Sequence, residues 1–492
     1  MSAIPFIDMH AIARQAMTLY GFLPHFPTDV IREIASFKNL DEPRLSLLRK
    51  KESIRDLRSL LWSSIDNEES RDLDQLEYCE RLPNREIRVM IAIADVDEYS
   101  AKNSPTDRYA RHNGTSVYTG VEIFPMFPDR LSWDLSSLIP NEDRLSIVID
   151  FSVRPDGSVR FNDIFHAIVA NKAKLVYETI GAWLEEKSSR PEEFKNLPGL
   201  EEQLRLQDEA AQRLGRYRAE SGALELETIE ASPVMKEGEV IDLTIKKKNR
   251  ARMIIENFMI AANGTMVWFL GKNKIPMIQR VVRTPQRWMK ITEVARELGE
   301  NLPPEPDPRA LAEFLKKRRE IDPVRFPDLS LTIVKLLGAG EYVLAESSRP
   351  SAGHFGLAVQ DYTHSTAPNR RYVDLVIQRL LKAVLVKENV PYNKIELNDL
   401  AVWCTEKDKA AKKVERFMRK VAACVLLKNR IGEIFDAIVT GASDTGTYVR
   451  LLSIPAEGRV VRGEKGMDVG EKVHVKLLRL EPEKGFIDFE GV

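Results

Sequence analysis

The sequence of 492 residues contains little cysteine and little histidine. Its three cysteines, Cys79, Cys404 and Cys424, form no CxxC pair, and its seven histidines show neither HExxH nor another zinc-ligand spacing. A disulfide framework needs more cysteines than this, and a zinc site needs closely spaced ligands. These counts exclude both, and they favour a reducing compartment such as the cytoplasm.

A targeting segment and a long hydrophobic run are also missing. Residues 1–15 do not show the basic-then-apolar pattern of a secretory signal. The longest uncharged run, residues 257–271, is too short and too polar to span a bilayer. We therefore expect a soluble, cytoplasmic protein that contacts no membrane.

The sequence has no excess of charge of either sign. It holds 73 lysines and arginines against 74 aspartates and glutamates, so its formal net charge is −1. This balance excludes a histone-like or tail-driven nucleic-acid binder, but it allows a local basic channel. There is no Walker A or GxSxG motif, and residues 338–343, GAGEYV, lack the third glycine of a dinucleotide-binding loop. We expect no nucleotide cofactor.

The length is sufficient for about three domains. Residues 8–38 are typical of two short helices, and residues 86–170 contain β-rich segments separated by turns. Helical patterns follow at 200–220, 251–270, 287–299, 308–320 and 395–428. The last 60 or so residues contain five short strand-like segments with glycine turns, a pattern that favours an OB barrel. We therefore expect a mixed α/β multidomain fold with a helical N-terminal module at 1–48, a large α+β domain at 49–428 and an OB-fold barrel at 429–492.

An acidic cluster occupies residues 63–80, with Asp66, Asp72 and Asp74 behind an apolar lead-in. Aspartates at i, i+6 and i+8 cannot share one face of a helix or strand, but they can converge on a turn. Carboxylate oxygens are the hard ligands that Mg²⁺ and Mn²⁺ prefer, and such ions can activate water for phosphodiester hydrolysis. The alternative is a solvated acidic loop.

Two basic features could bind nucleic acid. Pro368 and Asn369 come before Arg370 and Arg371, which we expect to open a helix, where guanidinium and free N–H groups suit a phosphate. Lysines and arginines are also dense at 245–252, around 407–430 and on the terminal barrel. Phe435 and Tyr448 are candidate stacking platforms for single-stranded RNA or DNA. The alternatives are a surface arginine pair and a solvated charged helix face.

Taken in order along the chain, these motifs resemble one family. The stretch SSIDNEESRDLDQLEY is similar to the entry motif of the ribonuclease II (RNB) exoribonucleases, and IAIADVDEYSAKNSPTDRYARHNGTSVYTGVEIF is similar to the family's next segment. GALELE, MIIENFMIAAN, HFGLAVQDYTHSTAPNRRYVDL and AAKKVERFM follow in the family's order. The resemblance covers roughly residues 50 to 430. The segment from residue 431 resembles the OB-fold RNA-binding barrel of many members.

The resemblance implies a metal site and catalytic groups. Asp66, Asp72 and Asp74 would bind Mg²⁺, with Mn²⁺ as a substitute, and Gln75 stands where the family usually has a fourth carboxylate. Asp74, Asp72 and Arg370 would be catalytic, with Arg370 holding the scissile phosphate.

The resemblance also implies how RNA is bound. Tyr118 would stack on a base at the 3′ end, and Leu226 stands where an opposing aromatic is usual. Glu256 would contact the terminal ribose 2′-hydroxyl, which distinguishes RNA from DNA. Glu415 would face the last base, and Arg371 would assist Arg370.

We therefore expect a monomeric 3′→5′ exoribonuclease that hydrolyses single-stranded RNA to nucleoside 5′-monophosphates with Mg²⁺. The alternative is a catalytically weakened RNA-binding protein on the same fold, which Gln75 favours and the three aspartates with Arg370 oppose. A DNA nuclease is disfavoured if Glu256 reads the 2′-hydroxyl.

Overall fold

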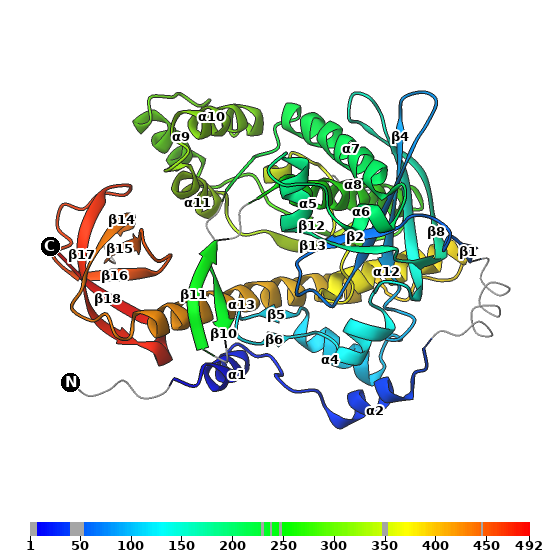
Figure 1. Cartoon of the computed structure of the whole chain (residues 1–492), viewed down its shortest axis with the longest axis horizontal. Helices are drawn as coiled ribbons and strands as arrows, with labels where there is room; N and C mark the ends of the chain where they lie inside the picture. The colour runs from blue at the N-terminus through cyan, green and yellow to red at the C-terminus, as the bar shows by residue number, and fades with distance from the viewer. Residues whose placement is uncertain are drawn as a thin grey trace.

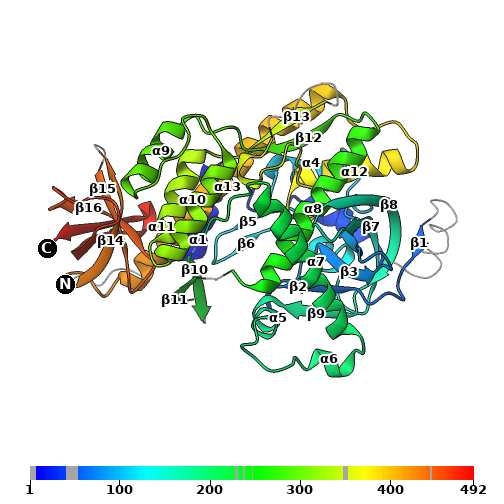
Figure 2. The same ribbon diagram turned by 90° about the horizontal axis from the view of Figure 1, so that it is seen from above.

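The structure is a computed structural model, and it describes residues 7–39, 54–227, 231–236, 239–245, 248–346, 353–443 and 446–492. In Figure 1 a sheet with its covering helices lies at one end and a barrel at the other, and the long helix α13 (Lys394–Leu427) runs between them. Seen from above, in Figure 2, the helices α9 to α11 lie between the barrel and the sheet. The mixed α/β fold and the C-terminal barrel are therefore confirmed.

The central sheet has seven strands in the order β1-β8-β7-β4-β3-β2-β9. Their bounds are β1 (Arg55–Asp56), β2 (Ser63–Asp66), β3 (Gln75–Arg81), β4 (Ile87–Ala94), β7 (Asp143–Val153), β8 (Val159–Ala170) and β9 (Ala173–Val176). Strands β4 and β7 are buried along nearly their whole length, and β7 carries Ser146, Asp150 and Ser152 among its buried apolar residues. The antiparallel β2–β3 pair positions the candidate active site, because its connecting loop carries acidic residues.

Helices α7 (Leu200–Glu220) and α8 (Arg250–Lys272) pack on each other and on the sheet, with α5 (Tyr177–Leu184) and α6 (Glu193–Asn196) beside them. By length and composition alone, α8 is long and apolar enough to cross a membrane, which the uncharged run did not indicate. However, 56% of its most apolar window is buried inside the fold. This is the burial of a core helix.

The N-terminal helices α1 (Met9–Leu19) and α2 (Thr28–Ser36) confirm the two predicted ones. Helix α1 packs on α13, and α2 packs on α4 (Pro105–Asn113). Met17 of α1, Met418 of α13 and Phe489 of the barrel belong to one hydrophobic core, so α1 is joined to the rest of the molecule. The boundary predicted at residue 48 lies outside the described residues.

The terminal barrel is closed in the order β14-β15-β16-β18-β17. Its strands are β14 (Ile434–Ser443), β15 (Gly446–Leu451), β16 (Glu457–Arg462), β17 (Lys472–Glu481) and β18 (Phe486–Gly491). All five strand-like segments read from the sequence are therefore strands. Closure leaves this small sheet without open edges.

The remaining strands and helices lie in the segments between those already described. They are β5 (Val117–Tyr118), β6 (Ile123–Phe124), β10 (Ala231–Lys236), β11 (Glu239–Ile245), β12 (Met277–Val281), β13 (Glu341–Ala345), α9 (Trp288–Glu297), α10 (Pro308–Ile321), α11 (Phe326–Leu337) and α12 (Tyr372–Leu385). Helices α9 to α11 have a hydrophobic cluster of their own around Trp288, Phe314 and Phe326. The helical patterns read from the sequence are all helices.

Candidate active site

The β2–β3 loop brings the three predicted aspartates to one cavity. Asp66 ends β2, Asp72 and Asp74 lie in the loop, and Gln75 begins β3. All four side chains line a cavity of about 250 Å³, together with residues of α8 and of the segment before α12. The aspartates thus converge, as their spacing predicts for a turn rather than for a helix or strand.

Asp74 is held by the segment that precedes α12. Its side chain is almost fully buried, and its Oδ2 accepts a hydrogen bond from Arg370 Nε at 3.0 Å. The Asn369 N–H donates to Asp74 Oδ1 at 3.3 Å, while the Ala94 N–H donates to the Asp74 carbonyl at 3.0 Å. The arginine and the aspartate most important to the predicted chemistry are therefore in direct contact.

Tyr118 forms part of the cavity wall opposite these groups. Its hydroxyl donates to Asp72 Oδ2 at 3.3 Å, and its backbone N–H donates to Glu415 Oε1 of α13 at 3.2 Å. The residue is 40% exposed, which leaves ring surface for a ligand. Tyr118 and Glu415, predicted from distant motifs, thus meet at the same place.

The cavity has too little positive charge for its carboxylates. Burial raises the pKa of Asp66 to about 6 and that of Asp74 to about 7. The Arg370 guanidinium counteracts both shifts, and the Asp72 carboxylate adds to both. Burial also raises the pKa of Asp72. Arg370 pairs with Asp74, whereas Arg252, which also lines the cavity, pairs with Glu178, so the three carboxylates keep an excess of negative charge and a cation is the natural complement.

The donor set fits a hard cation. Carboxylate and amide oxygens from Asp66, Asp72, Asp74 and Gln75 are the ligand type that Mg²⁺ and Mn²⁺ prefer. No three His, Cys, Asp or Glu side chains in the described residues already meet as a metal cluster, so the aspartates share the cavity without closing on one point. Gln75 provides an oxygen without a charge, so the site has one negative charge fewer than four carboxylates would give.

A buried carboxylate that the sequence analysis did not single out holds the arginine segment. Asp374 is fully buried and accepts from the Ala367 N–H at 2.8 Å, from Arg371 Nε at 2.9 Å and from Arg371 Nη2 at 2.7 Å. Helix α12 begins at Tyr372 with Arg371 as its N-cap residue, so the arginine pair stands at the start of the helix as expected, with Arg370 just outside it. Asp374 binds the Ala367 amide and Arg371, closing a turn ahead of the helix.

Two further contacts, also missed, support this segment. Ser136 Oγ donates to Asn369 Oδ1 at 2.7 Å, and the N–H and hydroxyl of Ser365 both donate to Asn263 Oδ1, at 2.9 and 2.7 Å. Asn263 belongs to α8, which also supplies apolar cavity residues, Met259 among them. The MIAAN motif contains Asn263, but its partner Ser365 lies 102 positions away in the sequence, so a local pattern could not identify the contact.

Two predicted RNA contacts lie outside the cavity lining. Glu256 forms ion pairs with Lys248 Nζ at 2.5 Å and Arg218 Nη2 at 3.5 Å. Leu226 packs against the α9–α11 cluster instead of facing Tyr118 across the cavity. The clamp expected between Leu226 and Tyr118 is therefore not formed in this structure, because the α9–α11 core takes up the leucine.

The two aromatics predicted for the barrel differ in exposure. Phe435 is 4% exposed and belongs to the core shared by the barrel and α13, so its ring has no free face for a base, and its predicted stacking role is wrong. Tyr448 alternates with buried residues along β15 and is partly exposed. Of the two, Tyr448 alone keeps the predicted role.

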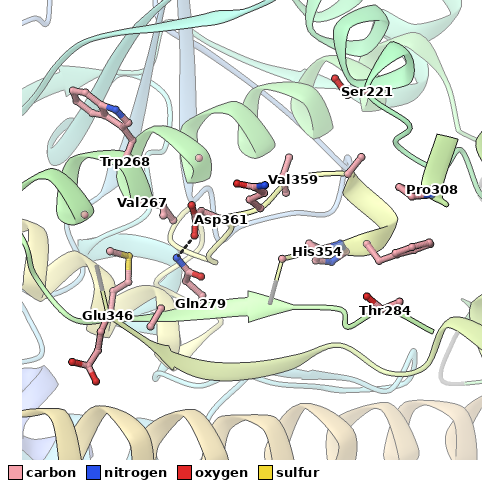
Figure 3. Close-up of a pocket in the computed structure, with 18 of the residues that line it drawn as sticks. Ser221, Val267, Trp268, Gln279, Thr284, Pro308, Glu346, His354, Val359 and Asp361 are labelled. Carbon is pink, nitrogen blue, oxygen red and sulfur yellow. Dashed lines mark hydrogen bonds between the residues drawn. The ribbon is translucent and has the colours of Figure 1, made fainter. Parts of the chain in front are cut away.

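A larger cavity lies elsewhere. It measures about 940 Å³ and lies between α8, the β12–β13 pair and residues 353–361. Figure 3 shows Gln279 and Asp361 next to one another in its lining, joined by a hydrogen bond of 3.1 Å from Gln279 Nε2 to Asp361 Oδ1. Among the described residues that line it, no carboxylate is paired with an arginine as in the smaller cavity. We therefore place the chemistry in the smaller one.

Comparisons with known proteins find family models that match the large domain and the terminal barrel. A family model for the RNB domain matches residues 54–387, and one for the RNase II-type exonuclease C-terminal S1 domain matches residues 433–492. Ribonuclease R of Thermotoga maritima is 29% identical over 505 residues, which cover 94% of this chain and 68% of that protein. Ribonuclease R of Escherichia coli is 30% identical over 425 residues, covering 82% of this chain and 51% of that protein.

Solved structures show the same fold. Mycoplasma genitalium RNase R in complex with ribose-methylated single-stranded RNA has a TM-score of 0.88 at 23% identity, over 99% of this chain and 78% of that one. Yeast Ssd1, a pseudonuclease, has a TM-score of 0.71 at 17% identity, over 93% and 56%. At these identities the likeness concerns the fold alone. Because the RNB model matches more than half of this chain, the chain belongs to the RNB family of ribonuclease II-type exoribonucleases.

Proposed function

We propose that this chain hydrolyses single-stranded RNA from the 3′ end and releases nucleoside 5′-monophosphates, with Mg²⁺ as cofactor and Mn²⁺ as a substitute. The observation that carries the proposal is the meeting of Asp66, Asp72, Asp74 and Arg370 in one cavity, with Tyr118 on its wall. The relatives support an RNA substrate, since RNase R of Mycoplasma genitalium has been solved with single-stranded and with double-stranded RNA.

In this mechanism Arg370 binds the scissile phosphate. Its side chain is 44% exposed while Nε is held by Asp74, so the outer edge of the guanidinium can face the ligand. A guanidinium fixed in this way is aimed before the substrate arrives, and it offsets charge that develops on the phosphate oxygens. Asp374 acts indirectly, because it fixes the turn that carries Arg370.

Asp66, Asp72, Asp74 and the Gln75 amide would hold the metal. A bound divalent ion supplies a water of lowered pKa and neutralises charge on the leaving oxygen. The raised pKa values of Asp66 and Asp74 fit this role, because carboxylates that repel one another gain most from a cation.

The 3′ end would be positioned by Tyr118. Its ring can stack on a base, and Glu415 fixes its backbone N–H, so the platform is held from α13. To contact a ribose hydroxyl, Glu256 would have to give up its ion pair with Lys248 or its ion pair with Arg218. Arg371 already donates twice to Asp374, so its contribution is to the turn rather than to RNA.

The second candidate function is RNA binding with weakened catalysis. Gln75 favours it, because a neutral amide replaces a metal-binding carboxylate at the cavity edge. The retained Asp66, Asp72, Asp74 and Arg370 oppose it, because burying three carboxylates beside an arginine is costly and has no evident use without a cation.

The test is incubation of the purified protein with 5′-end-labelled single-stranded RNA, with and without Mg²⁺, and products resolved to the nucleotide. The proposal expects a ladder that shortens from the 3′ end, requires the metal, and yields nucleoside 5′-monophosphates on chromatography. RNA binding without shortening at any Mg²⁺ or Mn²⁺ concentration would select the second function.

A further inference from the structure

Another pocket lies across α8 from the candidate active site. It measures about 480 Å³ and is bounded by the β7–β8 hairpin, α7, α8 and Val359. None of its lining residues lines the catalytic cavity, as far as the described residues show. Ile255 faces the catalytic cavity and Asn257 this pocket, and two positions along a helix turn the side chain by about 200°.

The walls of this pocket are aromatic and accessible. Tyr217 of α7 and Trp268 of α8 are 44% and 46% exposed, although both are large apolar side chains. Trp268 packs on Phe161 of β8, with ring centroids 4.5 Å apart, which fixes its orientation. Figure 3 shows Trp268 and Val359 at the neighbouring large cavity, which they also line, so the pocket opens beside that space.

The hairpin wall is held tightly against α7. Gly157 has φ of +87°, and a Cβ there would lie 2.2 Å from the Arg213 carbonyl oxygen and 2.7 Å from Tyr217 Cβ. Only a glycine allows this approach, because the conformation is left-handed and there is no room for a side chain. The hairpin wall of the pocket therefore has a fixed position against α7.

Unpartnered polar atoms lie in the pocket lining. Asn257 is 4% exposed; its Nδ2 donates to the Met253 carbonyl, but its buried Oδ1 has no hydrogen-bond partner among the described residues. Arg218 likewise has buried Nε and Nη1 groups without a hydrogen-bond partner there, while Nη2 faces Glu256. Buried polar groups are normally hydrogen-bonded. One acceptor and two donor groups of the residues that line this pocket are therefore left without a hydrogen bond among the described residues.

Positive charge lies at the hairpin side of the pocket. Arg154 and Arg160 both line it, and both pair with the single carboxylate of Glu86, at 3.7 and 2.7 Å. Two guanidiniums against one carboxylate leave one formal positive charge. An anionic group on the ligand would meet it there.

We propose that this pocket binds a nucleoside 5′-monophosphate, with the base between Tyr217 and Trp268, its polar edge on Asn257 and Arg218, and its phosphate toward Arg154 and Arg160. Aromatic walls suit a planar base, and the volume falls in the usual range for small-molecule sites. The proposal concerns binding and does not depend on the proposed hydrolysis.

The test is isothermal titration of the full chain with adenosine 5′-monophosphate in EDTA, comparing wild type with Gly264→Leu. Gly264 lines this pocket and also the large cavity, and a Cβ there meets nothing within 4 Å, so a leucine would occupy space where the two adjoin without a backbone clash. We expect Gly264→Leu to weaken binding about tenfold or more, because a filled cavity excludes the ligand. The matched control is Gly271→Leu, on the same helix and also without a neighbour within 4 Å, but lining only the large cavity.

The site is supported if Gly264→Leu loses affinity while Gly271→Leu binds like the wild type. It is overturned if both variants bind as tightly as the wild type, or if the wild type shows no binding at millimolar ligand. Tyr217→Ala, which shortens a wall without filling the pocket, should also weaken binding, and unchanged affinity there contradicts the base placement. Unchanged thermal unfolding and RNA hydrolysis establish that each variant is folded. Adenosine should bind about threefold more weakly than the monophosphate, as for an exposed charge pair, and equal binding would overturn the assignment of a phosphate.

Discussion

The catalytic cavity and the terminal barrel are assembled in opposite ways. The barrel interior is apolar, with Val449, Leu477 and Phe489 fully buried. The cavity is built around buried charges, Asp74 on Arg370 and Asp374 on Arg371, whose desolvation cost is offset only while each has its partner. We therefore expect changes inside the barrel to act on stability, and changes in the cavity to act both on stability and on the proposed hydrolysis.

The two regions are joined by α13. Glu415 of this helix contacts the cavity wall at Tyr118, while Met418 and Val421, less than two turns farther on, belong to the barrel core. Removal of residues 430–492 would therefore expose part of α13. Single side-chain variants separate the two regions more cleanly than a truncation.

The largest effect after loss of the cavity aspartates is expected for Asp374→Ala. It leaves Arg371 buried without its partner, which typically costs about 3–5 kcal/mol of unfolding free energy. Because the turn carrying Arg370 is then loose, kcat should also fall, by about 100-fold for a misplacement near 1 Å. Denaturant unfolding and steady-state hydrolysis measure the two effects.

Asp374→Asn is the control for that variant. It keeps an acceptor for the Ala367 amide and should recover part of kcat, with KM little changed in both variants. A fall in stability without a fall in kcat would mean that Asp374 supports the fold but does not position Arg370.

Tyr448 and Phe435 provide the corresponding test in the barrel. Tyr448→Ala should weaken binding of long single-stranded RNA by about 1–3 kcal/mol, the usual value of one base-stacking platform. Phe435→Leu should leave RNA affinity unchanged and lower the thermal midpoint, because this ring is buried in the core. Filter binding and thermal unfolding measure both, and a loss of affinity in Phe435→Leu alone would reverse the assignment.

Gln75→Asp tests whether the cavity is short of one carboxylate. A fourth buried negative charge should raise a neighbouring pKa by at least one unit, so the metal-free protein should lose about 1.4 kcal/mol of stability. Mg²⁺ should then stabilise Gln75→Asp more than wild type, in thermal unfolding with and without the ion. Equal stabilisation of the two proteins would show that position 75 does not face the metal.

The smallest effect on RNA hydrolysis is expected for Leu226→Phe. Because Leu226 packs in the α9–α11 cluster, a larger ring should cost about 1–3 kcal/mol by overpacking and leave the ladder of end products unchanged. Tyr118→Ala should shift that ladder toward longer fragments. A changed ladder in Leu226→Phe would restore the clamp expected from the sequence.

Local patterns predicted much of this molecule, and long-range packing explains what they did not. The barrel strands and the convergence of Asp66, Asp72 and Asp74 follow from turns and spacing within short segments. Phe435 could not be assigned in the same way, because β14 carries apolar residues on both faces, with Phe435 and Ile438 both buried. Leu226 and Asp374 depend on partners brought together by the tertiary fold.

The most direct test of the catalytic assignment is hydrolysis of end-labelled single-stranded RNA by Asp74→Asn, with RNA affinity measured on the same preparation. The amide keeps the volume of Asp74 and an acceptor for Arg370, but it removes one charge from the metal site. We expect loss of hydrolysis, by about 10²–10³-fold or more as for other preorganised charge-stabilising groups, with RNA affinity nearly unchanged. Hydrolysis at the wild-type rate would show that Asp74 is not a catalytic residue.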